Sequence, residues 1–390
     1  MTDISIKIID ALKESIGAAS EPVSLHEPYI DSTDNNFVEE CLKSGWVSSV
    51  GSYVNEFEHL LEKKTGAKYA IAVGTGTAAL HTALILAGVK AGEEVLVPSL
   101  TFVASANAIS YCQAIPHFVD SDPDRLCVDP ESLESYLEHK ILDTKNGPIN
   151  KDTGRIVRAL LPVHVLGIPA DMNYLLKIAE RFKITVVEDA AESLGSFIGD
   201  THTGNFGLAG ALSFNGNKII TTGGGGAIIT NNGDLAEQAK HITTTARVDS
   251  DIYFTHDQVG FNYRMPNLNA ALGCSQIKKL DKLIRQKNKL RDIYKNYFSK
   301  INEVQLVKTP SECVSNNWLN GLLIRNSSIQ IRNEIIKATN SRNYMTRPAW
   351  TPMHYLNMYK KCPRMSLTGA EKIYESLICL PSSAKLVQPE

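Results

Sequence analysis

Between residues 56 and 230 the chain alternates short apolar runs with stretches of helical spacing, and this alternation limits the folds open to it. The apolar runs have four to seven residues, and several lack the polar alternation of a strand with one solvated face. Strands buried on both faces are typical of a mainly parallel sheet covered by helices. The seven runs are Tyr69–Val73, Glu94–Val97, Ala114–Val119, Val157–Val163, Ile184–Val187, Ala211–Phe214 and Gly226–Thr230.

Three stretches between these runs have the spacing of helices: Thr77–Leu86, Pro130–His139 and Met172–Phe182. We therefore predict an α/β fold whose large domain, residues 25–250, holds a mainly parallel sheet sandwiched by helices. Beyond about residue 250 the pattern becomes mixed, which indicates a smaller α+β domain over residues 251–390. Residues 1–24 are expected to form a helix that packs on this smaller domain.

A long amphipathic helix is predicted from Leu280 to Ile301, where apolar residues recur mostly at intervals of three and four. Its outer face is basic, and Lys287 interrupts its apolar stripe. A basic face can bind phosphate or nucleic acid, but a solvated helix face explains such charge runs several times more often. The whole chain has 40 Lys and Arg against 42 Asp and Glu. This balance argues against a nucleic-acid or membrane-surface binder.

Seven cysteines are scattered along the chain without a CxxC pair, so neither a disulfide framework nor a metal site such as structural zinc is expected. The first residues lack the basic-then-apolar pattern of a signal segment. Tyr69–Val89 has no charged residue, yet its glycine-threonine turn favours a buried strand and helix over a membrane span. We expect a cytoplasmic protein.

The segment GTGTAA at residues 74–79 directly follows an apolar run and opens a predicted helix. Backbone amides and hydroxyls at a helix N-terminus can bind phosphate without a cationic side chain. The segment is not a Walker loop, because no Lys-Ser/Thr follows its glycines, and it is incomplete as a dinucleotide fingerprint. Taken alone, tight packing of the turn explains it equally well.

Asp189 lies at or just past the carboxyl end of the run Ile184–Val187, where α/β sheets collect ligands. A helix N-cap is the ordinary alternative for this aspartate. Lys218 lies between an apolar run and four glycines at 223–226. A partly buried lysine is an available nucleophile for a carbonyl group, although lysines at loop tips are common.

Together, a phosphate cradle, a strand-end aspartate and a partly buried lysine are what pyridoxal phosphate requires. The phosphate needs the helix N-terminus, the pyridine nitrogen needs a carboxylate that keeps it protonated, and the aldehyde needs an amine. The three features occur in this chain in that order.

From about Ser44 to Leu380 the chain resembles the fold-type I, pyridoxal-phosphate-dependent sugar aminotransferases of the DegT/StrS type, which aminate nucleotide-linked keto-sugars. So many motifs in order are highly specific to this family. They are SGWVSSVG (44–51), GTGTAALHTAL (74–84), VPSLTFVASANAI (97–109), VHVLG (163–167), VVEDAAESLGS (186–196), SFNGNKIITTGGGG (213–226), GFNYRMPNLNAALG (260–273) and TRPAWTPMH (346–354).

The resemblance implies roles for the residues at the matching positions. Lys218 would carry the internal aldimine and then move the proton between the sugar carbon and the cofactor. Asp189 would bind the pyridine nitrogen, and Gly76, Thr77 and Ser213 the phosphate. The presence of Lys218 argues against the branch of the family that has histidine there and dehydrates its substrate.

Further cofactor contacts are implied for three residues. Phe102 would stack on the ring, although a core aromatic is the commoner role of a phenylalanine. Glu192 stands near the ring hydroxyl, where the family more often has Gln or His, and a carboxylate there would repel a phenolate unless protonated. Asn262 would reach the phosphate of the neighbouring subunit's cofactor, which implies a homodimer with shared sites. Gly224 also departs from the family, which commonly has Glu there.

The substrate contacts that the resemblance suggests are Arg264, Arg347, Trp350 and His354. Arg347 could pair with a diphosphate, while Trp350 and His354 could line the sugar or nucleotide pocket. For Arg264, ordinary hydrogen bonding within a loop is the alternative. For the segment 346–354, a packed proline-rich loop is a comparable explanation.

The motif variants look most like the subgroup that acts on UDP-linked 4-keto-6-deoxy-N-acetylhexoses in legionaminic-acid-type and related surface-glycan pathways, with L-glutamate as amino donor. A GDP-4-keto-6-deoxymannose (perosamine-type) aminotransferase is the second hypothesis. A non-catalytic, cofactor-binding regulatory relative is a third, which the Lys218–Asp189 pair counts against. An NAD-binding oxidoreductase rests on the glycine turn alone.

Overall fold

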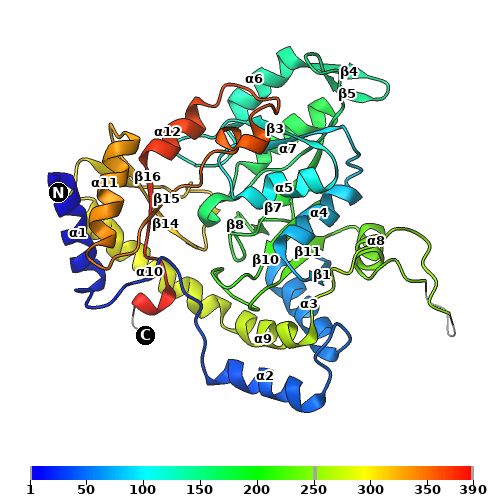
Figure 1. Ribbon diagram of the computed structural model, residues 1–390, viewed down its shortest axis with the longest axis horizontal. Helices are drawn as coiled ribbons and strands as arrows, with labels where there is room; N and C mark the ends of the chain where they lie inside the picture. The colour runs from blue at the N-terminus through cyan, green and yellow to red at the C-terminus, as the bar shows by residue number, and fades with distance from the viewer. Residues whose placement is uncertain (1, 249–252, 388–390) are drawn as a thin grey trace.

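The central element of the fold is a seven-stranded sheet with the strand order β1-β11-β10-β7-β6-β2-β3 (Figure 1). The computed structural model describes residues 2–248 and 253–387. Strand β11 is antiparallel to both of its neighbours, and the other pairs are parallel. The mainly parallel sheet predicted from the sequence is therefore confirmed, and each of the seven apolar runs overlaps one of its strands. The strands are β1 (Tyr69–Val73), β2 (Glu94–Pro98), β3 (Ile115–Val119), β6 (Val157–Leu160), β7 (Thr185–Asp189), β10 (Ala209–Ser213) and β11 (Gly226–Thr230).

Helices bury both faces of this sheet, which explains the lack of polar alternation in its strands. In β1, Ala70 and Ala72 belong to one core cluster, whereas Ile71 and Val73 belong to another on the opposite face. The first cluster includes residues of α3 (Ser52–Thr65), α6 (Pro130–Lys140), α7 (Met172–Phe182) and α9 (Asn267–Lys278). The second includes residues of α4 (Gly76–Leu86), α5 (Val103–Tyr111) and α8 (Gly233–Thr243).

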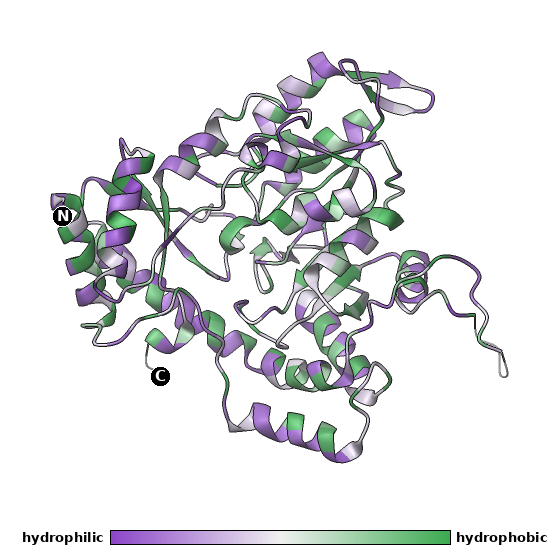
Figure 2. Cartoon of the chain, viewed as in Figure 1, coloured by the Kyte–Doolittle hydropathy of each residue, from purple (hydrophilic) through white to green (hydrophobic). Residues whose placement is uncertain are grey.

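A second, four-stranded antiparallel sheet has the order β12-β14-β16-β15. Its strands are β12 (Val304–Leu306), β14 (Asn320–Ile324), β15 (Arg347–Pro348) and β16 (Leu377–Leu380). Around it lie α10 (Leu280–Phe298), α11 (Ile329–Asn340) and α12 (Thr368–Ser376). Helix α1 (Asp3–Ile16) packs against α10 and α11. In Figure 2 both α1 and α11 show hydrophilic and hydrophobic faces, as expected for helices that cover a core on one side.

The C-terminal third does not pack as one separate body. Helix α9 packs against α3 and against α2 (Ser32–Ser44). The backbone amides of Met353 and Phe118 donate to Ser99 and Pro363, respectively, and so tie the segment after β15 to the large sheet. The division at residue 251 stays a prediction, and these contacts cross it.

Lys287 interrupts the apolar stripe of α10 because it has internal partners. Its amine is buried and donates to the carbonyl oxygens of Trp318, at 3.0 Å, and Ser382, at 2.5 Å. The helix ends at Phe298, three residues before the predicted end at Ile301. Among the described residues, no helix is both long and apolar enough to cross a membrane.

The remaining elements are short. They are the hairpin of β4 (Ile141–Thr144) and β5 (Gly147–Asn150), and the three-stranded sheet of β8 (Phe197–Ile198), β9 (Thr201–His202) and β13 (Cys313–Val314). Short 3₁₀ turns are η1 (Val165–Gly167), η2 (Met353–Tyr355), η3 (Asn357–Tyr359) and η4 (Ala384–Leu386).

Candidate active site

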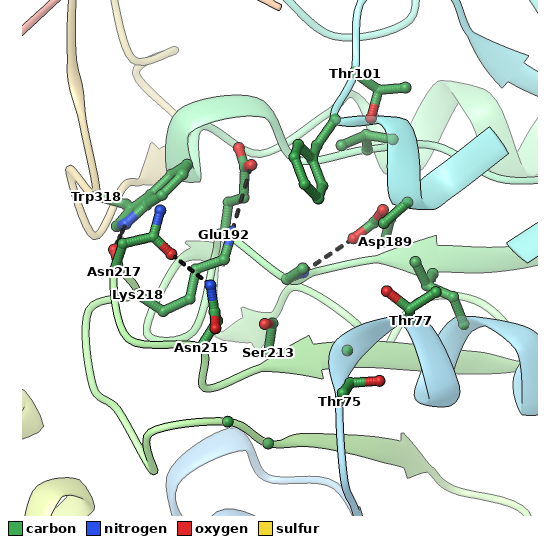
Figure 3. A pocket seen from close by; sticks show the side chains of 18 of the residues that line it. Thr75, Thr77, Thr101, Asp189, Glu192, Ser213, Asn215, Asn217, Lys218 and Trp318 are labelled. Atoms are coloured by element: carbon green, nitrogen blue, oxygen red, sulfur yellow. Dashed lines mark hydrogen bonds and ion pairs between the residues drawn. The ribbon is translucent and has the colours of Figure 1, made fainter. Parts of the chain in front are cut away.

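A cavity of about 280 Å³ lies where the carboxyl ends of β2, β7 and β10 converge (Figure 3). This edge of a parallel sheet is where α/β proteins bind ligands. The start of α4, the segments after these strands and two tryptophans from the C-terminal third form its wall. The lining residues include Thr75, Gly76, Thr77, Thr101, Phe102, Asp189, Glu192, Ser213, Asn215, Asn217, Lys218, Gly224, Trp318 and Trp350.

The start of α4 forms an open cradle next to Ser213. Thr75 caps the helix, because its hydroxyl oxygen accepts a hydrogen bond from the Ala78 amide at 3.0 Å. A Cβ atom added at Gly76 would lie 2.8 Å from Ser213 Cβ and 3.1 Å from its hydroxyl oxygen. Glycine therefore keeps the space between the helix end and Ser213 free. The positive end of the helix dipole and the nearby hydroxyls suit this space to a phosphate.

Asp189 ends β7 inside the cavity wall. Its Oδ2 atom accepts a hydrogen bond from the Ser105 hydroxyl at 2.7 Å, and its Oδ1 atom accepts one from the Ala191 amide at 3.2 Å. Burial raises the pKa of this carboxyl, and the two hydrogen bonds oppose the change. A buried carboxylate of this kind is stabilised by a cationic ligand group, such as a protonated ring nitrogen.

Lys218 lies in the loop between β10 and β11, and its side chain is 12% exposed. Its Nζ atom is 3.6 Å from Glu192 Oε1 and 4.0 Å from the centroid of the Trp318 ring. Figure 3 shows the end of the lysine side chain beside both groups. The amine is thus held inside the cavity, although its residue lies in a loop.

Glu192 follows β7, and its carboxyl group is hydrogen-bonded to the backbone. Its Oε2 atom accepts a hydrogen bond from the Leu166 amide at 2.8 Å, while Oε1 faces Lys218. Burial raises the pKa of this carboxyl to about 7, against the opposing effect of Lys218. The carboxyl can therefore hold a proton at neutral pH, which removes the repulsion expected between a carboxylate and a phenolate oxygen.

Comparison with known proteins places the chain in a family. Residues 28–390 match the DegT/DnrJ/EryC1/StrS aminotransferase family. The putative pyridoxal phosphate-dependent aminotransferase EpsN of Bacillus subtilis is 34% identical over 372 residues, covering 94% of this chain and 92% of that protein. The chain belongs to the DegT/DnrJ/EryC1/StrS aminotransferase family. It is a pyridoxal-phosphate-dependent sugar aminotransferase, as the motifs predicted.

Two further relatives place this member of the DegT/DnrJ/EryC1/StrS family among sugar-modifying enzymes. The GDP-perosamine synthase of Caulobacter vibrioides is 33% identical over 371 residues, covering 94% of this chain and 95% of that protein. The solved structure of Helicobacter pylori PseC, an aminotransferase involved in the biosynthesis of pseudoaminic acid, matches with a TM-score of 0.85. It is 25% identical and covers 94% of this chain and 95% of that chain.

The cavity of this aminotransferase fits pyridoxal phosphate on three counts. A side chain at residue 76 would fill the cradle at α4, the Asp189 carboxyl is buried without a cation in hydrogen-bonding contact among the described residues, and Lys218 points its amine into the same space. Phe102, whose residue is 51% exposed, also lines the cavity and has a ring that can cover one side of a bound cofactor.

Four residues expected at the site do not line the cavity of this chain. Arg264 pairs with Val73 at the end of β1, and Asn262 pairs with Thr244, which follows α8. The arginine donates to the Asn262 side-chain oxygen at 3.3 Å. Arg347 is exposed and donates to the Thr346 carbonyl oxygen. His354 is buried, and its ring nitrogens hydrogen-bond with Ser99 (2.7 Å) and Glu371 (3.1 Å). Their roles toward substrate or a second subunit stay predictions.

Trp318 and Thr101 also line the cavity, although neither was expected there from its sequence motif. Trp318 lies in NNWLNG (316–321), directly before β14. A tryptophan next to a strand is typically a core residue, so nothing in the neighbouring sequence indicates that Trp318 lies beside Lys218. Thr101 hydrogen-bonds with Ser105 at 2.8 Å and so supports the hydroxyl that donates to Asp189.

Glu192 should make the stability of the cofactor-free protein depend on pH. The carboxyl ionises near its ordinary value of 4.5 in the unfolded chain but near 7 in the folded one. Between these values the folded state binds more protons, so its free energy of unfolding falls as pH rises. Glu192→Gln should remove this pH dependence. Between pH 4.5 and pH 7 the free energy of unfolding of the variant, relative to that of wild type, should therefore rise by up to about 3 kcal/mol.

Denaturant unfolding of both proteins across that pH range measures this difference. Glu334→Gln, on the exposed side of α11, is the matched control and should track wild type. A constant difference between Glu192→Gln and wild type over the range would contradict the raised pKa.

Proposed function

We propose that the protein transfers an amino group from L-glutamate to a nucleotide-linked 4-keto-6-deoxy sugar, with Lys218 as the residue that bonds to the cofactor. The observation that carries the proposal is the position of the Lys218 amine, which faces a cavity bounded by Asp189 and the start of α4. An amine, a buried carboxylate and a phosphate cradle in one cavity match the aldehyde, ring nitrogen and phosphate of pyridoxal phosphate.

The residues of the chain have distinct roles in this proposal. Pyridoxal phosphate, when bound, supplies an electron sink for the carbon next to the transferred nitrogen. Asp189 accepts a hydrogen bond from the ring nitrogen and keeps it protonated. The α4 amides, Thr77 and Ser213 bind the phosphate and fix the ring. The Nζ atom of Lys218, when it is not bonded to the cofactor, would take a proton from one carbon and return it to another.

The first candidate sugar is a UDP-linked 4-keto-6-deoxy-N-acetylhexose of a surface-glycan or nonulosonic acid pathway. The segments 188–196, 221–226 and 346–354 support it, because they resemble the subgroup that acts on such sugars. The overall similarity to a pseudoaminic acid pathway aminotransferase is in line with it. Trp350 lines the cavity and offers an aromatic wall for the sugar.

A GDP-linked 4-keto-6-deoxymannose is the second candidate, and a specific observation favours it. Three relatives that are 32% to 34% identical are GDP-perosamine synthases. The name of these relatives refers to a GDP-linked sugar. Identity over the whole chain therefore favours the GDP-linked candidate, whereas the local motifs favour the UDP-linked one.

Parallel assays with both sugars discriminate between the candidates. The protein, loaded with pyridoxal phosphate and supplied with L-glutamate, is given each keto-sugar, and the aminosugar and 2-oxoglutarate are measured by mass spectrometry. The first proposal predicts a higher kcat/KM for the UDP-linked sugar. A higher value for the GDP-linked sugar would replace it with the second. Conversion of neither sugar, alongside amino transfer from glutamate to the cofactor, would contradict both.

We also propose that the enzyme is a homodimer in which Asn262 serves the neighbouring subunit's site. Large apolar side chains are exposed in the segment that leads to Asn262, where Phe254 is 78% and Val259 87% exposed. Trp46, whose carbonyl oxygen accepts a hydrogen bond from Asn267, is 62% exposed. Exposed apolar residues in such number are typical of a surface that another chain covers. Sedimentation analysis that gives a monomer at micromolar concentration would contradict the dimer.

A further inference from the structure

Trp318 is the cavity residue that lies against the amine of Lys218. Its ring centroid is 4.0 Å from Lys218 Nζ, and the tryptophan is 4% exposed. Figure 3 shows the amine beside this ring and joined to Glu192 by a dashed line. Aromatic faces attract cations, and the attraction grows when water is excluded. The indole and the carboxylate therefore approach the amine from different segments of the chain.

Three hydrogen bonds fix the position of Trp318. Its indole Nε1 donates to the carbonyl oxygen of Asn217, the residue before Lys218, at 2.8 Å. Its backbone amide donates to Asn316 Oδ1 at 2.8 Å, and its carbonyl oxygen accepts from the buried Lys287 amine at 3.0 Å. Trp318 is thus bound through its ring to the loop that carries Lys218 and through its backbone to helix α10.

Asn316 connects Trp318 to Glu192. Its Nδ2 atom donates to the carbonyl oxygens of Glu192, at 2.9 Å, and Leu194, at 3.0 Å, while its Oδ1 atom accepts from Trp318. A Cβ atom at Gly167 would lie 1.9 Å from Asn316 Oδ1, and Gly167 has a φ of +88°. Gly167, the glycine of the VHVLG motif, therefore leaves room for the Asn316 side chain, which links the backbone of Trp318 to that of Glu192.

We propose that Trp318 is a positioning residue of the reaction: its indole face and the Glu192 carboxyl group, whose Oε1 atom faces Nζ, together hold the protonated amine of Lys218 whenever this lysine is not bonded to the cofactor. The inference rests on the proposed function, in which Lys218 alternates between amine and ammonium. The proton stays on Nζ in the held state, and Trp318 takes none. The other titratable groups that face this pair are Asp189, which lines the same cavity, and His26, whose ring centroid is 6.4 Å from that of Trp318.

Competitive acylation of the cofactor-free protein tests this holding site without any turnover. Acetic anhydride labels neutral amines, and peptide mass spectrometry gives the extent of Lys218 labelling at each pH. Access to the amine sets the maximal labelling rate, whereas stabilisation of the ammonium sets the pH of half-maximal labelling. Trp318→Leu should lower that pH by about one unit, equivalent to about tenfold more reactive amine at a given pH.

Two further variants separate the holding site from a merely structural effect. Trp318→Phe keeps an aromatic face and should restore part of the wild-type value. Trp350→Leu makes the same change elsewhere in the cavity wall, so it should leave the pH of half-maximal labelling unchanged if the effect belongs to the Trp318 ring. In the loaded enzyme, Trp318→Leu should lower kcat with little change in KM for glutamate.

The proposal is overturned if Trp318→Leu leaves the pH of half-maximal labelling at the wild-type value, or if Leu and Phe shift it equally. Circular dichroism checks that each variant is folded. If Trp318→Leu does not fold, Trp318→Phe is the test, and an unchanged pH of half-maximal labelling in that variant overturns the proposal. The outcome is separable from that of the proposed function. Full turnover by a Lys218→Ala variant would refute the proposed function while leaving a measured labelling shift as evidence for the Trp318 contact.

Discussion

Replacing Lys218 with alanine should lower turnover by about 10⁴-fold or more while the protein still binds pyridoxal phosphate. Of the described residues that line the cavity, Lys218 alone carries a primary amine. No neighbouring residue can therefore take over both its bond to the cofactor and its transfer of the proton. The cradle at α4 and the Asp189 carboxyl remain in the variant, so non-covalent binding of the cofactor should persist.

Steady-state kinetics and equilibrium dialysis of the cofactor measure these two effects. Lys145→Ala, in the exposed turn of the β4–β5 hairpin, is the matched control and should behave as wild type. Added methylamine should restore a small part of the activity of Lys218→Ala, because it supplies the missing amine from solution. Wild-type turnover in Lys218→Ala would refute the assignment of this lysine.

Asp189→Asn should bind the cofactor but lose turnover by about 10²-fold or more. The asparagine can still hydrogen-bond with Ser105 and the Ala191 amide, so the cavity should keep its shape. It carries no charge, however, and cannot stabilise a protonated ring nitrogen. An unprotonated ring is a poor electron sink, which slows proton removal more than substrate binding.

The expected signature is a fall in kcat with little change in KM for glutamate. Asp200→Asn, in the exposed turn between β8 and β9, changes the same group at the surface and should leave both constants unaltered. Near-normal kcat in Asp189→Asn would remove Asp189 from its proposed role.

The sequence predicts the central sheet well because its signals are local. Each strand is a short apolar run, and the end of β7 at Asp189 follows directly from the run that begins at Ile184. The glycine-threonine turn before α4 is equally local. These features place a phosphate cradle, a carboxylate and a lysine near one edge of the sheet, because the carboxyl ends of parallel strands meet there.

The parts that sequence reasoning missed depend on contacts between distant segments. Trp318 is one hundred residues from Lys218 in the chain and reaches it through the packing of α10 and the second sheet. His354 lies in a motif of the family, yet the structure uses both of its ring nitrogens in contacts with Ser99 and Glu371. A motif gives the position of a residue in the chain, whereas the packing of separate elements decides which side chains share a cavity.

The central claim is that Lys218 and Asp189 operate pyridoxal phosphate in this cavity, and a visible absorption spectrum tests it most directly. The purified protein is mixed with the cofactor and the spectrum is recorded before and after L-glutamate is added. We predict a visible band of lysine-bonded cofactor that Lys218→Ala lacks, and its replacement by the band of pyridoxamine phosphate after glutamate. The absence of any visible band in the wild-type protein, or its persistence in Lys218→Ala, would contradict the claim.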